Sequence, residues 1–75
     1  MTPIKPYLVR AIELIEAIED TQRQEKENRE TASKTDVPEY AKICTEIADK
    51  TVELVNNLEK QLELTRQQIL LIWHD

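Results

Sequence analysis

The chain has 75 residues, a formal net charge of −5, and neither glycine nor phenylalanine. This length gives room for one domain. The missing glycine excludes a phosphate-cradling glycine loop, a dinucleotide-binding fingerprint and a nucleophile elbow, because each of these motifs requires glycine. The acidic balance argues against direct nucleic acid binding, which needs a basic surface.

The first predicted helix covers about residues 6 to 30. Pro6 suits its first turn, because the first amide groups of a helix have no partner within it. Apolar residues then follow in alternating steps of four and three, the spacing of a heptad seam. The seam consists of Ile4, Leu8, Ala11, Ile15 and Ile18, with Tyr7, Ile12 and Leu14 beside it.

The second half of this helix is polar. From Glu19 to Asp36 the only apolar residue is Ala32. Glu19 and Arg23, like Glu25 and Arg29, stand four residues apart in the orientation that stabilises a helix. We therefore expect a solvated helical extension. The alternative for this segment is a mobile linker of polar and charged residues.

A turn is predicted over about residues 31 to 37, and a second helix over about residues 38 to 73. Asp36 followed by Glu39 has capping-box spacing, and Pro38 suits a first turn. The seam of this helix reads Ala41, Cys44, Ala48, Thr51, Val55, Leu58, Leu62, Thr65, Ile69 and Ile72, with Tyr40, Ile47, Val52 and Leu54 beside it. No internal repeat is visible.

The apolar face of the second helix is longer than that of the first. An antiparallel hairpin therefore leaves part of it uncovered, and another surface must cover it. Residues 69 to 73 add five consecutive large apolar side chains, of which one helix face can hide only two or three. The predicted partner interface is Tyr40, Ile43, Ile47, Ile69, Leu70, Ile72 and Trp73. A protein, most simply a second copy of the chain, is the expected occupant. For the C-terminal cluster, folding back over the chain's own core and binding to a membrane surface are the alternatives.

Two pairs of acidic residues provide the strongest enzyme signal. Glu16 and Glu19, and Glu46 and Asp49, each stand three residues apart, which puts both carboxylates of a pair on one side of a helix. Four such groups can hold Mg²⁺ against a triphosphate. Together with the run from Thr45 to Asp49, they resemble the all-α nucleoside triphosphate pyrophosphatases of the MazG type over about residues 8 to 64. That resemblance implies Mg²⁺-dependent pyrophosphate release.

The seam of the second helix favours a different interpretation of these carboxylates. Glu46 and Asp49 lie opposite its apolar stripe, whereas the acidic side chains of that family point into the helical bundle. Lys50 follows the second pair directly, and the further helices of the family have no room in this chain. We therefore expect a solvated helix face, no catalytic residues, and no metal or cofactor.

Two shorter resemblances concern single helical runs. Lys5 to Ala11 resembles the start of the stringent-starvation protein B adaptors, whose β-rich body has no counterpart here. Ala41 to Glu46 resembles the second helix of Rop-like hairpins, and that resemblance implies dimerisation into a four-helix bundle.

Cys44 is the only cysteine and His74 the only histidine. Cys44 lies on the seam, where we expect a small buried core residue rather than a nucleophile, because no histidine stands near it. His74 is expected to be exposed. A single cysteine allows no intrachain disulfide, and neither a signal peptide nor a membrane-spanning stretch of about 20 apolar residues is visible. The expected location is cytoplasmic.

These patterns predict an all-α fold, an antiparallel hairpin of two amphipathic helices that assembles into a helical bundle or coiled coil. The expected function is a non-enzymatic protein-interaction module that self-associates or binds a protein partner, as a small adaptor, chaperone or inhibitor. The alternatives are a divergent Mg²⁺-dependent nucleoside triphosphate pyrophosphatase and an acidic mimic of nucleic acid that inhibits a nucleic-acid-binding protein.

Overall fold

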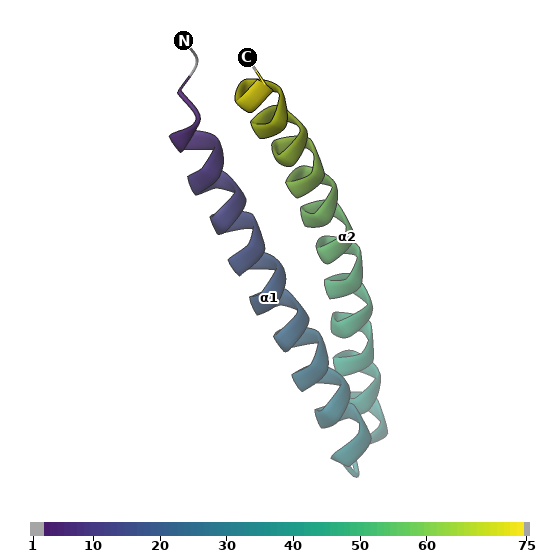
Figure 1. Ribbon diagram of the computed structural model, residues 1–75. Coiled ribbons are helices and arrows are strands. Elements are labelled where there is room, and N and C mark those ends of the chain that lie inside the picture. The colour runs from purple at the N-terminus through teal and green to yellow at the C-terminus, as the bar shows by residue number, and fades with distance from the viewer. Residues whose placement is uncertain (1–2, 75) are drawn as a thin grey trace.

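The chain folds as two long helices packed side by side in an antiparallel hairpin (Figure 1). The structure is a computed structural model and describes residues 3 to 74, so Met1, Thr2 and Asp75 of the predicted domain lie outside the described residues. Helix α1 is Lys5–Lys34 and helix α2 is Pro38–His74. The predicted all-α hairpin is confirmed.

The hairpin is a rod rather than a compact particle. It measures 59 × 14 × 12 Å, with a radius of gyration of 17.2 Å. A compact domain of this length would have a radius of gyration of about 11 Å. With two helices and no third layer, each helix touches only one neighbour, so each keeps most of its circumference in solvent.

Helix α1 continues well past the end expected near residue 30. It runs unbroken to Lys34, so the polar segment is helix and the linker alternative is wrong. Pairs of charged side chains one turn apart support it, because they lie close together on a helix surface. Arg29 Nε, for example, lies 2.8 Å from Glu25 Oε2.

The turn reverses the chain without glycine. Thr35 has extended backbone angles, φ −77° and ψ 144°, and no residue from 3 to 74 has a positive φ. The Thr35 amide donates to Thr31 O at 3.0 Å, and the Val37 amide to Thr35 Oγ1 at 3.3 Å. The Val37 carbonyl accepts from the Ala41 amide, so Val37 occupies the N-cap position of α2 that the sequence assigned to Asp36.

The core is a single heptad seam between the helices. On α2 the predicted phase is confirmed, because all ten predicted seam positions, from Ala41 to Ile72, are buried or half-buried. Cys44 is among them, with 3% of its surface exposed, as expected for a small core residue.

On α1 the predicted phase is wrong by one residue in part of the seam. Tyr7 is half-buried and Leu14 is 2% exposed, whereas Leu8, which the sequence placed on the seam, is 43% exposed and Ile15 is equally open. Ile4, Ala11 and Ile18 hold their predicted places. Both Leu8 and Ile15 follow directly after the residue that α2 covers.

The seam of α1 also continues through the polar half. Its further members are Thr21, Glu25, Asn28 and Ala32, all buried or half-buried. These side chains are large enough to fill the seam, because α2 presents only small side chains near the turn, at Ala41, Cys44, Ala48 and Thr51. Large apolar residues of α1 are needed only farther along, where α2 carries valine, leucine and isoleucine.

The three buried threonines bring no unsatisfied polar group into this seam. Thr21, Thr51 and Thr65 each donate the hydroxyl to the carbonyl oxygen four residues earlier, at 2.6 to 2.9 Å. Within the described part of the chain, no buried side-chain nitrogen or oxygen lacks a partner. A threonine that is bonded to its own helix packs as a β-branched side chain of modest size.

Candidate interaction surface

A second apolar row runs along α2 outside the hairpin seam. We call it the outer stripe, and it consists of Tyr40, Ile43, Ile47, Leu54, Leu64 and Leu71. These side chains are 47 to 68% exposed. They belong to a regular series in steps of three and four, in which Lys50, Asn57, Gln61 and Gln68 fill the other places. Such a series is the sequence pattern of a helix that packs against another helix.

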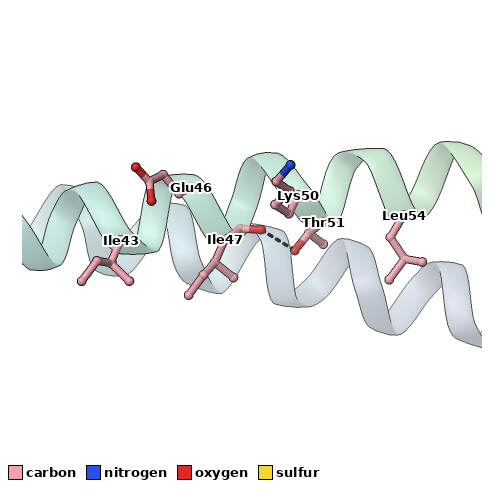
Figure 2. Close-up of a pocket in the computed structure, with 6 residues that line it drawn as sticks. All are labelled: Ile43, Glu46, Ile47, Lys50, Thr51 and Leu54. Carbon is pink, nitrogen blue, oxygen red and sulfur yellow. Dashed lines mark hydrogen bonds between the residues drawn. The ribbon is translucent and has the colours of Figure 1, made fainter.

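The N-terminal half of this stripe forms an open groove. Ile43, Ile47 and Leu54 project from the same side of α2, while the charged ends of Glu46 and Lys50 lie along the opposite edge (Figure 2). Thr51 closes the groove toward α1, and its hydroxyl is bonded to the Ile47 carbonyl (Figure 2). The groove is thus an apolar floor with a charged rim.

Two hydrogen bonds between the helices identify the flanks of the hairpin. Arg10 Nη2 donates to Gln61 Oε1 at 3.0 Å on one flank. On the other flank Arg29 Nη2 donates to Asp49 Oδ1 at 3.2 Å. The first flank carries the outer stripe, because Leu54 and Ile47 lie one and two heptads before Gln61 on the same line of α2.

A separate apolar patch lies on the Arg29 flank of α1. Leu8 and Ile15 stand on the same heptad line as Arg29, and Ile12 stands next to them, all three more than 40% exposed. We call these three residues the α1 patch. It occupies the end of the hairpin where the N-terminus and C-terminus lie together, away from the turn (Figure 1).

The predicted partner interface separates into three parts. Tyr40, Ile43 and Ile47 lie together in the outer stripe. Ile69 and Ile72 are half-buried on the seam that faces α1.

Leu70 and Trp73 form the third part. Leu70 lies three heptads after Asp49 and therefore on the Arg29 flank, with Trp73 one turn beyond it. Trp73 is 75% exposed. The seven residues thus do not form one continuous surface.

The predicted interface contains half of the outer stripe and none of the α1 patch. Leu64 has no place in the predicted interface, Leu71 enters it only as part of the C-terminal cluster of residues 69 to 73, and Leu54 is predicted only beside the seam. The signal was present, because the series that begins at Tyr40 repeats with the same steps as the seam itself. In the described structure α1 covers the seam series, and the second series stays exposed.

The acidic pairs do not converge. Glu16, Glu19, Glu46 and Asp49 are all exposed, and each pair lies on the outward side of its own helix. The Asp49 carboxylate is engaged by Arg29. Among residues 3 to 74, no group of three or more histidine, cysteine or acidic side chains is placed to hold a metal ion.

The Arg29 guanidinium donates to a carboxylate on each helix, Glu25 on α1 and Asp49 on α2. Its hydrogen bond to Glu25, and then that to Asp49, raise the pKa of Arg29 above the usual value for arginine. The side chain therefore stays charged and links α1 to α2. His74 is exposed at the end of α2, as predicted.

Neither described helix has a stretch long and apolar enough to cross a membrane. Comparison with protein-family models, with curated proteins and with solved structures gives no match for this chain.

Proposed function

We propose that this chain is a non-enzymatic protein-interaction module that acts through its exposed apolar helix faces. The observation that carries the proposal is the outer stripe, a regular apolar series along α2 that no other part of the described chain covers. Exposed apolar rows of this length are typical of protein interfaces, since water contact with them is costly.

The chain's own packing supports the same conclusion. Among residues 3 to 74, thirteen large apolar side chains are exposed and only eight residues are buried. A small domain is stabilised by the apolar surface that it removes from water. A hairpin that exposes this many apolar side chains would therefore become more stable by associating with another molecule. Self-association or a partner protein would supply the missing cover, as in a small adaptor, chaperone or inhibitor.

Sedimentation equilibrium from micromolar to millimolar concentration tests the proposal. We expect a species of at least two chains, where one chain has a mass of 8.8 kDa. Ile47→Glu should dissociate it, because the charge enters the apolar floor of the groove, whereas Asn56→Glu on the opposite flank should not.

If the chain stays monomeric, immobilised protein provides the deciding measurement. Wild-type chain and the Ile47→Glu variant are compared as baits in lysate of the source cells. A protein retained by the wild type and lost with the variant supports the proposal through a foreign partner. A monomer with no such difference contradicts it.

A further inference from the structure

We infer that the outer stripe is the contact between two copies of this chain, with α2 of one copy packed antiparallel against α2 of the other. This inference rests on the proposed function and names the occupant of the stripe. It is carried by exposed surface area, by the spacing of the stripe and by the distribution of charge along α2.

The exposed area of one hairpin exceeds that of a compact chain by more than one interface. The hairpin exposes 5979 Å². A compact monomer of 8.8 kDa exposes about 4,800 Å², so the excess is about 1,200 Å². A stable interface removes about 800 Å² from each partner. One additional helix contact therefore brings the exposed area close to that of an ordinary compact protein.

The steps of three and four identify the occupant as a helix. A strand or an irregular segment would not match a stripe that follows the surface of α2 over its full length. The stripe is also complementary to itself, since isoleucine and leucine side chains on one α2 can fill the gaps between those of another.

Lys50, which occupies a position in the series of the outer stripe, distinguishes the two possible directions. In a parallel pair in register, Lys50 of both copies would meet in the stripe, where like charges repel. In an antiparallel pair centred between Leu54 and Asn57, Lys50 lies level with the partner's Gln61. The same register brings Tyr40 level with the partner's Leu71, and Ile47 level with the partner's Leu64.

The charged line beside the stripe agrees with the antiparallel direction. The line passes through Glu39, Glu46, Glu53, Lys60, Gln67 and His74, all exposed. Its first half is acidic and its second half is neutral or basic. In the antiparallel register Glu53 therefore lies beside the partner's Lys60, and the symmetry repeats that pair. In a parallel pair this line would instead face the opposite flank of the partner's α2, so Glu53 and Lys60 would not pair between copies.

Electron-spin distance measurements test the direction and register. Spin labels are attached at Lys42→Cys and, separately, at Asn56→Cys, each in a Cys44→Ala background. Both sites are exposed and outside the stripe. The antiparallel register separates the two labels at position 42 by at least about 40 Å along the helix axis, and sets those at position 56 at about the same level. A parallel pair would give similar short distances, about 20 Å, at both sites.

Charge exchange provides the second measurement on the same dimer. Glu53→Lys and Lys60→Glu should each raise the dissociation constant roughly fivefold, and the double variant should restore it, because exchanged charges pair again between copies. Ile47→Glu should raise it by at least about tenfold.

Three results would overturn the inference. They are equal short distances at both labelled sites, a dimer that Ile47→Glu leaves intact, and a chain that remains monomeric at millimolar concentration. The first two leave the proposed function standing, since the chain still associates. A chain that stays monomeric contradicts the proposed function as well only under one condition. That condition is that no lysate protein binds the wild-type bait and fails to bind the Ile47→Glu bait.

Discussion

Arg10 on α1 donates a hydrogen bond of 3.0 Å to Gln61 on α2, across 51 residues of sequence. Gln61 also belongs to the series of the outer stripe, so this contact fixes how the stripe is turned relative to α1. The outer stripe lies on the Arg10 flank of the hairpin, and the α1 patch lies on the Arg29 flank. Two separate apolar surfaces on opposite flanks permit two separate contacts.

Leu14→Ala should destabilise the hairpin by about 2 to 3 kcal/mol, because Leu14 is 2% exposed and its loss leaves a cavity in the seam. Leu8→Ala is the matched control on the same helix. Leu8 is 43% exposed, so its replacement should cost less than about 1 kcal/mol. Urea denaturation monitored by circular dichroism measures both. Equal losses would contradict the observed phase of α1.

The difference between the predicted and observed seams has a physical cause in the composition of α1. Tyr7 and Leu8, like Leu14 and Ile15, are adjacent apolar residues, and either member of each pair satisfies steps of three and four from Ile4 or Ala11. The choice depends on which line faces α2, and the sequence of α1 does not contain that information. On α2 the series from Ala41 to Ile72 carries only apolar residues and threonine, whereas the series beside it is interrupted by Lys50, Asn57, Gln61 and Gln68. Its ten seam positions were therefore predictable.

In the polar half of α1 the seam continues without large apolar residues, so hydrophobicity alone does not reveal it. The sequence prediction ended the stripe at Ile18 because no large apolar residue follows. Thr21 nevertheless continues the same heptad series, and on α2 the side chains near the turn are small. A seam built from small and polar residues leaves no hydrophobic signal.

The outer stripe, by contrast, could be predicted from its spacing. The flank of the hairpin on which it lies could not be predicted, because that depends on contacts between the helices.

Ala48→Leu should destabilise the turn half of the hairpin by about 1 to 3 kcal/mol. Ala48 is completely buried, at 0% exposure, so three added carbon atoms have no space between the helices. Thr45→Leu places the same side chain at an exposed position one turn away and should change the free energy of unfolding much less. Thermal unfolding compares the midpoint temperatures of the two variants. Equal midpoints would show that the helices are not closely packed at Ala48.

Mg²⁺ with any nucleoside triphosphate should give no pyrophosphate release above that of a buffer control. The acidic pairs lie on outward sides of separate helices, so their four carboxylates do not share a metal site. A coupled colorimetric assay for pyrophosphate tests this expectation. Release that Glu46→Gln abolishes and Glu53→Gln preserves would establish the pyrophosphatase alternative and contradict the non-enzymatic proposal.

The last prediction separates Leu70 and Trp73 from the outer stripe. Both side chains lie on the Arg29 flank, where 43% of Leu70 and 75% of Trp73 are exposed. The double variant Leu70→Ala, Trp73→Ala should therefore change the free energy of unfolding by less than about 1 kcal/mol.

The same double variant should change the dissociation constant of the dimer by less than about twofold, since the proposed contact lies on the other flank. Sedimentation equilibrium measures this constant beside that of Ile47→Glu. A loss of dimer as large as that of Ile47→Glu would assign Leu70 and Trp73 to the interface between copies, and the antiparallel contact through α2 would then be wrong. An unchanged dimer leaves this exposed tryptophan, together with the α1 patch at the same end of the hairpin, available for a second protein, since tryptophan is enriched where partners bind most tightly.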